Sequence, residues 1–327
     1  MNTPNNTNTR RTPTVNHAAF ASRRYAVLAL ARAGRALTPL LALSVLGVGI
    51  IGPLSAVAQE VSAPPASVGE SAGPAGLADD SQTPSLSLGA GMAVTPVYEG
   101  SSAYTVRMLP LLKAAAPTGD WGTFTAAFPE GLRWDLPTGE RFGVALLTTW
   151  DEGRKESIRT LSGHDHHLAG MGDLGGTAMG GVELSVNYAP YRFFVRGMQA
   201  LRERHYGGEN LGHTAYADLG LGSQVPLGDD LSMSTQTYVT WSDRHDMMSR
   251  FGVTPEQALA SGYHEHRVGG GLRSMTMAWG LDWRWTPQVT LSGGVQVSGL
   301  TSSAVRNSPL TEKNVSGALY LNALYRF

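Results

Sequence analysis

The stretch that decides the fold is Asn314–Phe327, NVSGALYLNALYRF, at the end of the chain. Its side chains alternate without a break between an apolar set and a mostly polar set, and side chains on a β-strand point to alternate faces with a period of two. The apolar set consists of Val315, Gly317, Leu319, Leu321, Ala323, Tyr325 and Phe327. The segment is therefore a predicted strand with one face suited to an apolar environment and one suited to a polar environment.

The strand ends on an aromatic residue, Phe327, and carries a second one, Tyr325, two positions earlier. A terminal strand of this form is what the barrel assembly machinery of the outer membrane recognises in the proteins that it inserts. We therefore expect Tyr325 and Phe327 to form a barrel-assembly signal. The expected partners are that machinery, outer-membrane lipid and lipopolysaccharide. A water-soluble β-sandwich can also end in an alternating strand, so the rest of the chain must decide between the two.

The N-terminal part of the chain predicts export. Residues 1–35 contain six arginines and no acidic residue, an apolar stretch follows at Leu40–Ile51, and Ala56–Ala58 is a small-x-small cleavage pattern. A basic region, a short apolar core and a cleavage site in this order are typical of a secretory signal peptide. The apolar stretch is too short for a membrane anchor, which needs about 20 residues. We predict a cleaved signal peptide at residues 1–58.

Composition excludes several classes of function. The formal charge of the chain is −1, and it becomes −7 when the six leader arginines leave with the signal peptide. An acidic protein lacks the basic face of a nucleic-acid-binding protein, so no nucleic-acid partner is expected. The chain has no cysteine, which excludes disulfides and thiolate chemistry. Residues 59–84 are rich in Ala, Pro and Ser, and they predict a flexible periplasmic leader.

Strand patterns recur from Ser85 to Phe327, and turn signals separate them. Twelve strands fit the pattern, and five very short connections alternate along the chain with connections that are mostly longer and polar. The short connections are Pro117–Asp120, Pro137–Glu140, Ala189–Pro190, Gly228–Asp230 and Thr286–Gln288. The hairpin at Pro129–Glu130 and the strand Gly131–Leu136 are the weakest assignments, and ten strands is the alternative.

This layout predicts an all-β fold: an antiparallel transmembrane β-barrel at residues 85–327, with short periplasmic turns and long extracellular loops. A closed barrel satisfies the backbone hydrogen bonds of every strand inside a membrane. The expected location is therefore the outer membrane of a Gram-negative bacterium.

Charged residues occur on the polar faces of the predicted strands, which line the lumen of such a barrel. Opposite charges in a narrow lumen favour a packed network of ion pairs over an open channel. The candidate lumen charges are Glu183, Arg192, Arg196, Asp218, Asp282 and Arg284. We also expect Glu99 and Arg107 to form an ion pair at the mouth of the barrel.

Two small histidine clusters are the only candidates for a metal site. They contain His164 and His166 in one predicted loop, and His264 and His266 in another. Metal ligation needs three or four groups that converge at about 2 Å, and adjacent residues in a loop rarely converge unaided. Solvated loop histidines are therefore the preferred interpretation, with no metal and no cofactor. No serine nucleophile accompanies the loop histidine His213, so we predict a protein without enzymatic activity.

Two motifs resemble those of a known family, the MltA-interacting protein (MipA/OmpV) family of outer-membrane proteins. The first motif runs from Pro96 through Tyr104 to Arg107, and the second begins at Phe251 and reads FGVTPEQA. The matching residues are Pro96, Tyr98, Glu99, Gly100, Tyr104, Arg107, Phe251, Gly252, Thr254 and Pro255. The resemblance covers residues 85–327.

The resemblance implies a non-enzymatic scaffold or interaction protein linked to cell-envelope maintenance. Members of the family have been described as bringing a lytic murein transglycosylase together with a murein synthase, so these two enzymes are the implied partners. A small solute channel and a surface adhesin are the alternatives. The adhesin hypothesis would depend on the long loops at Glu152–Asp173 and Asp243–Arg267.

Overall fold

The computed structural model describes Met1 and residues 83–327. Apart from Met1, the predicted signal peptide at residues 1–58 and nearly all of the predicted leader at residues 59–84 lie outside the described residues.

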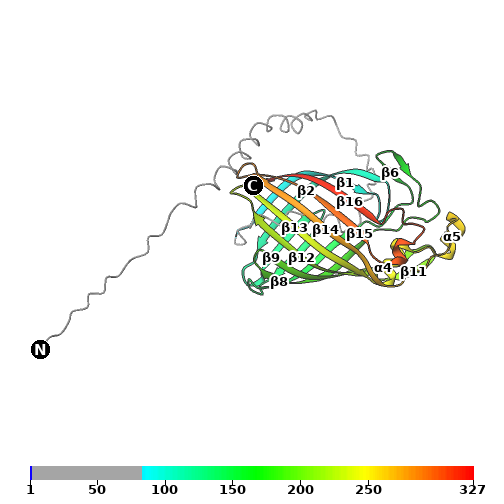
Figure 1. The fold of residues 1–327 in the computed structure, drawn as a ribbon, viewed down its shortest axis with the longest axis horizontal. Coiled ribbons are helices and arrows are strands. Elements are labelled where there is room, and N and C mark those ends of the chain that lie inside the picture. The colour runs from blue at the N-terminus through cyan, green and yellow to red at the C-terminus, as the bar shows by residue number, and fades with distance from the viewer. Residues whose placement is uncertain (2–82) are drawn as a thin grey trace. The chain divides into compact units, whose positions relative to one another are not determined.

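Twelve strands close into an antiparallel barrel (Figure 1) in which each strand pairs with its sequence neighbours and the first strand pairs with the last. The strands are β1 (Ser85–Pro96), β2 (Tyr104–Pro117), β3 (Thr123–Phe128), β4 (Gly131–Leu136), β5 (Phe142–Asp151), β8 (Thr177–Tyr188), β9 (Tyr191–Ala200), β12 (Ala215–Pro226), β13 (Leu231–Ser242), β14 (Gly271–Arg284), β15 (Val289–Leu300) and β16 (Val315–Arg326). The prediction of twelve strands is confirmed, and the ten-strand alternative is wrong because β3 and β4 pair as a separate hairpin.

The alternating stretch at the end of the chain is the closing strand of the barrel. β16 pairs with β1 from Ser87–Arg326 to Val94–Leu319, and it pairs with β15 on its other side. Leu319, Leu321 and Tyr325 are exposed on the outer surface. Every strand keeps the same alternation, since the apolar residues that face lipid take every second position and leave the others to the lumen.

Tyr320 shows how closely the lumen side chains pack. Its ring lies over two glycines, Gly280 on β14 and Gly294 on β15, where a side chain would overlap the phenol. At Gly294 a Cβ atom would also lie against the carbonyl oxygen of Trp279. Glycine is required at Gly294 because backbone and ring approach each other there without room for a methyl group.

Short turns gather at one end of the barrel, and one of them holds the 3-10 turn Gly119–Trp121. At the opposite end, the β3–β4 hairpin tip and the seven-residue β1–β2 connection have no helix or strand, and the other four connections are longer and carry secondary structure of their own (Figure 1). These elements are β6 (Ile158–Thr160), β7 (Gly163–Asp165), β10 (Arg204–Tyr206), β11 (Glu209–Gly212), α4 (Arg244–Phe251), α5 (Pro255–Ser261) and α6 (Ser303–Arg306). In an outer-membrane barrel the long loops are extracellular and the short turns periplasmic.

The two helices of the longest loop have sequence-encoded starts. Asp243 accepts a hydrogen bond from the backbone N–H of Asp246 and caps α4. Thr254 and Gln257 form a reciprocal capping box at the start of α5, with Pro255 in its first turn. None of the helices in the described part of the chain is long and apolar enough to cross a membrane.

One part of the barrel wall is lower than the rest. The hairpin of β3 and β4 reaches only to Leu112 on β2 and to Thr148 on β5. Above it, the segment Tyr104–Leu111 pairs with β1 on one side, and no described strand pairs with it on the other. We call this gap, above Pro129–Glu130 and between Tyr104–Leu111 and the end of β5, the wall notch.

Replacement of Gly294 by alanine is expected to destabilise the barrel by about 1–3 kcal/mol, because an added methyl group overpacks the site under Tyr320. Gly222 is the matched control, since it also faces the lumen and an added Cβ would meet only Thr235 O at 3.7 Å. Urea unfolding of both variants in detergent measures the difference. Equal midpoints for Gly294→Ala and Gly222→Ala would contradict this account of the packing.

Candidate functional site

The long loops fold together over the extracellular end of the lumen, and we call residues 97–103, 152–176, 201–214, 243–270 and 301–314 the loop cap. Two apolar clusters hold it together. The first is formed by Leu174, Tyr206, Leu211, Met247, Met248, Phe251, Val268, Leu300 and Val305, and the second by Val97, Tyr98, Ile158, Leu168, Met171, Val253 and Leu310. Because each cluster draws on several loops, the loops pack as one unit and not as separate segments.

The first turn of α4 carries a buried carboxylate that ties the loop cap to the wall. Asp246 accepts from Arg273 of β14 at 2.6 Å and from Arg250 of its own helix at 2.9 Å. Burial alone raises the pKa of the Asp246 carboxyl, but Arg250 and Arg273 outweigh burial and lower the pKa below its ordinary value. Asp246 is therefore ionised at neutral pH and holds α4 in place through two charged hydrogen bonds.

Arg250 extends this network across the lumen to β5. Its guanidinium donates to Asp151 at 3.2 Å, and Asp151 also accepts from Arg204 at 3.1 Å. Arg154 donates to the carbonyl of Arg250 at 2.7 Å and to the hydroxyl of Tyr206 at 2.7 Å. The result is a continuous chain of charged groups from β14 through α4 to β5.

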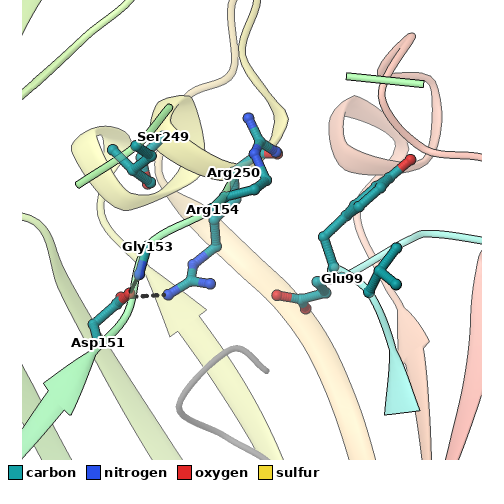
Figure 2. Close-up of a pocket in the computed structure, with 9 residues that line it drawn as sticks. Glu99, Asp151, Gly153, Arg154, Ser249 and Arg250 are labelled. Carbon is teal, nitrogen blue, oxygen red and sulfur yellow. Dashed lines mark hydrogen bonds and ion pairs between the residues drawn. The ribbon is translucent and has the colours of Figure 1, made fainter. Parts of the chain in front are cut away.

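A small cavity of about 30 Å³ remains inside this network, next to α4. Figure 2 shows Glu99 and Asp151 pointing toward it from opposite sides, with arginines of the loop cap between them. A space of this size has room for about one water molecule. The side chains of the charged network therefore leave little free space around α4.

Glu99 and Arg107 do not form the predicted ion pair. The carboxylate of Glu99 instead lies 3.4 Å from the guanidinium of Arg273. The same guanidinium also binds Asp246. The guanidinium of Arg107 is buried and has no hydrogen-bond partner among the described residues. The negative charge of Glu152 acts on this guanidinium through space. The prediction chose Arg107 because it is close to Glu99 in the sequence. Arg273 is far from Glu99 in the sequence but lies next to it in the barrel.

The other residues of the first motif connect the first loop to the last. The hydroxyl of Tyr98 donates to Glu312 at 2.9 Å, and burial followed by the charge of Glu312 raises the pKa of Tyr98. The carbonyl of Gly100 accepts from the backbone N–H groups of Glu312 and Lys313, and the hydroxyl of Tyr104 accepts from Gly317 N–H. Pro96 is the last residue of β1. The first motif thus joins the two ends of the barrel chain at its mouth.

The second motif forms the centre of the loop cap. Phe251 is fully buried in the first apolar cluster. Gly252 ends α4 with its N–H bound to the carbonyl of Met248, and Thr254 and Pro255 begin α5. The hydroxyl of Thr254 also donates to the carbonyl of Gly207 in a neighbouring loop at 2.7 Å. These residues therefore position α4 inside the mouth of the barrel.

A second charged cluster lies lower in the lumen, around Glu183 of β8. Its carboxylate accepts from Arg196 at 2.7 Å, from Arg133 at 2.9 Å and from Arg192. Arg196 also lies 3.9 Å from Asp218. Sequence reasoning did not select Arg133, although its position on the polar face of β4, two residues before Asp135, is a signal that would have identified it.

Two of the proposed lumen charges lie outside this cluster. Asp282 accepts from the hydroxyl of Ser292 at 2.6 Å and contacts none of the arginines around Glu183. Arg284 lies at the periplasmic end of β14, where it forms a 3.5 Å ion pair with the exposed Asp230. Arg284 still pairs with Thr290 in the barrel wall, so its assignment as a lumen charge stays a prediction, at the periplasmic rim and outside the Glu183 cluster.

Below the loop cap, the periplasmic half of the lumen contains a cavity of about 520 Å³. We call it the lumen cavity. Its walls combine charged residues such as Lys113, Arg133 and Arg192 with apolar residues such as Leu147 and Phe194. The cavity is as large as a typical small-molecule site, which occupies roughly 300–1,000 Å³.

The imidazole rings of the histidine candidates contact one another within their own loops, and His266 also lies 2.8 Å from the carbonyl oxygen of Ala304 in the last loop. The rings of His164 and His166 stack at 6.2 Å, and those of His264 and His266 meet edge to face at 6.2 Å. The described residues include no group of three or more His, Cys, Asp or Glu side chains placed to hold a metal ion. The loops instead meet at His167, whose backbone carbonyl accepts from the Tyr263 hydroxyl at 2.8 Å.

Replacement of Glu183 by glutamine is expected to destabilise the barrel by about 3 kcal/mol, because it leaves three arginines without their common anion. The matched control is Asp135→Asn, which affects the half-exposed partner of Arg133 alone and is expected to cost below about 1 kcal/mol. Urea unfolding in detergent compares the two. A Glu183→Gln variant as stable as Asp135→Asn would show that the cluster does not support the fold.

Comparison with solved structures shows barrels at low sequence identity. The translocator domain of the autotransporter NalP from Neisseria meningitidis is 13% identical, with 94% of this chain and 100% of that chain covered and a TM-score of 0.42. A Pseudomonas aeruginosa FadL homologue is 9% identical, with 75% and 90% covered and a TM-score of 0.39. The outer-membrane protein OmpT of Vibrio cholerae is 7% identical, with 75% and 97% covered and a TM-score of 0.32.

No curated protein matches the sequence. A family model does match, and its description is MltA-interacting protein MipA. The match runs over residues 88–327, which include both motifs, all but the start of β1 and the closing strand β16. The chain therefore belongs to the MipA family of outer-membrane barrel proteins.

Proposed function

We propose that this protein is a non-conducting barrel that anchors murein-remodelling enzymes at the periplasmic face of the outer membrane. The observation that carries the proposal is the loop cap, which fills the extracellular mouth with two apolar clusters and a buried charged network. A channel for solutes needs a continuous water-filled lumen, whereas an anchor needs only a stable barrel with a free periplasmic face.

The energetics of the loop cap support a closed state. Asp246 and Arg273 are buried and Arg250 is only 14% exposed, so withdrawal of α4 would leave charged groups of opposite sign without their partners. Breaking a buried ion pair by removing one partner costs about 3–5 kcal/mol. Transient opening of the mouth for each passing solute is therefore expensive.

The family supports the identity of the partners. The family description names an interaction with MltA, a murein transglycosylase, and such an enzyme acts on the periplasmic side. The short turns and the lumen cavity face that side, while the long loops are used for closure. We therefore expect a lytic murein transglycosylase, and with it a murein synthase, to bind at the periplasmic end.

Binding of a soluble lytic murein transglycosylase tests the anchor proposal. Protein purified from outer membranes and placed in nanodiscs, which expose both faces, is expected to bind the enzyme in a surface plasmon resonance assay. Sealed outer-membrane vesicles with the long loops outside are the control, and these are expected not to bind it because the periplasmic face is enclosed. Absence of binding to nanodiscs, or equal binding to sealed vesicles, would refute the proposal.

A further inference from the structure

The wall notch exposes a strand edge that is poorly suited to pairing with another strand. At its upper end, the carbonyl of Tyr104 already accepts from the backbone N–H of Leu161 at 2.9 Å. Near its lower end, Pro110 has no backbone N–H to donate. Proline and short length are devices that protect sheet edges from strand addition. The notch is therefore better explained as an opening than as a site for a further strand.

The rim of the wall notch is apolar and lies within the membrane. Met108, 79% exposed, points outward from β2, and Phe128 and Trp150 are exposed across the gap. Met108 is nine residues from Pro117 at the periplasmic turn, which places it about 20 Å above that turn at about 3.3 Å per residue and a tilt of about 45°. The apolar band of such a barrel is about 25 Å tall, so the rim meets the outer leaflet.

The lumen cavity reaches the outer surface at the same place. Glu130, Gly131 and Leu132, which form the tip of the β3–β4 hairpin and the start of β4, belong to its lining. Leu132 is also 45% exposed on the lipid face. Because Glu130 and Gly131 line the cavity, the cavity reaches the tip of the hairpin, which is also the lower edge of the wall notch.

The chemistry of the cavity selects an amphiphile. Ala127 and Leu147 offer apolar contacts near the hairpin, and the side chain of Arg192, 42% exposed, points into the same space from β9. Lys113 also lines the cavity, and its charge acts on the carboxyls of Glu130 and Asp282. A hydrocarbon chain would contact the apolar side, and an anionic head would meet Lys113 and Arg192.

We propose that the wall notch is a lateral entrance through which a single-chain amphiphile of the outer leaflet, with a hydrocarbon chain and a carboxylate head, enters the lumen cavity. The occupant comes from the membrane because the rim of the notch is continuous with lipid, whereas the extracellular mouth is filled by the loop cap. This binding site is separate from the periplasmic surface at which murein enzymes are expected, so either proposal can fail alone.

Photo-crosslinking tests the entrance. Protein purified from outer membranes is reconstituted in liposomes with a long-chain fatty acid that carries a diazirine on its chain, irradiated, digested and mapped by mass spectrometry. We expect adducts on the inward-facing Ala127 and Leu147 in addition to outward-facing residues such as Leu321. Adducts confined to outward-facing residues would overturn the proposal.

Neighbouring alanines on β3 provide a matched pair of variants. Ala127→Phe fills the cavity below the wall notch and is expected to abolish the adduct on Leu147, while the same change at Ala126, which points outward, leaves that adduct unchanged. Equal effects of the two changes would overturn the proposal. If Ala127→Phe does not fold, Lys113→Gln replaces it, and it is expected to reduce the adduct on Leu147 by removing the partner of the carboxylate.

Cross-links between two protein chains at Met108, without inward adducts, would indicate that a second copy of the protein covers the wall notch, and they would overturn the proposal.

Discussion

The carboxylate of Asp246 is the constraint on which the closed barrel depends. It is 1% exposed, and it accepts hydrogen bonds from Arg250 in its own helix and from Arg273 in the barrel wall. An uncompensated charge in such a place costs several kcal/mol, so α4 stays where both arginines reach Asp246. Because the folded-state pKa of Asp246 is lowered, this stabilisation is complete above the unfolded pKa of about 4 and is lost as the pH falls through the lower folded value.

The position of α4 determines the rest of the loop cap. With α4 in the mouth, Arg250 reaches Asp151 on the opposite wall, and Phe251 enters the first apolar cluster. The following residues, Val253 and Thr254, then connect to the second cluster and to the β10–β11 hairpin. A barrel of twelve strands has a lumen narrow enough for one short helix and its charged partners to fill the upper part. Lower down, the Glu183 cluster braces one wall but leaves the lumen cavity open.

Much of the fold could be predicted from the sequence, because alternation along a strand is a local property. The alternating terminal stretch is the closing strand of the barrel, as its pattern predicts. The short strand Gly131–Leu136 was the least secure prediction, yet its six residues already imply the low wall above the β3–β4 hairpin. Local pattern was sufficient for these features since each depends on neighbours in sequence.

The charged networks could not be predicted in the same way, because they depend on which strands face each other across the lumen. Glu99 pairs with Arg273, far along the chain, and not with the nearby Arg107. Arg133 joins Glu183 although 50 positions separate them. The two MipA motifs identified the loops that matter, but only the three-dimensional arrangement shows that they form the loop cap.

Single-channel conductance in a planar bilayer tests the central claim most directly. Wild-type protein purified from outer membranes is predicted to be silent. The Asp246→Lys variant is predicted to give stable steps, because a cation beside Arg250 and Arg273 expels α4. The control Glu256→Lys makes the same charge change on the exposed start of α5 and is predicted to stay silent. Stable steps from the wild-type protein, or a silent and correctly folded Asp246→Lys barrel, would contradict the account.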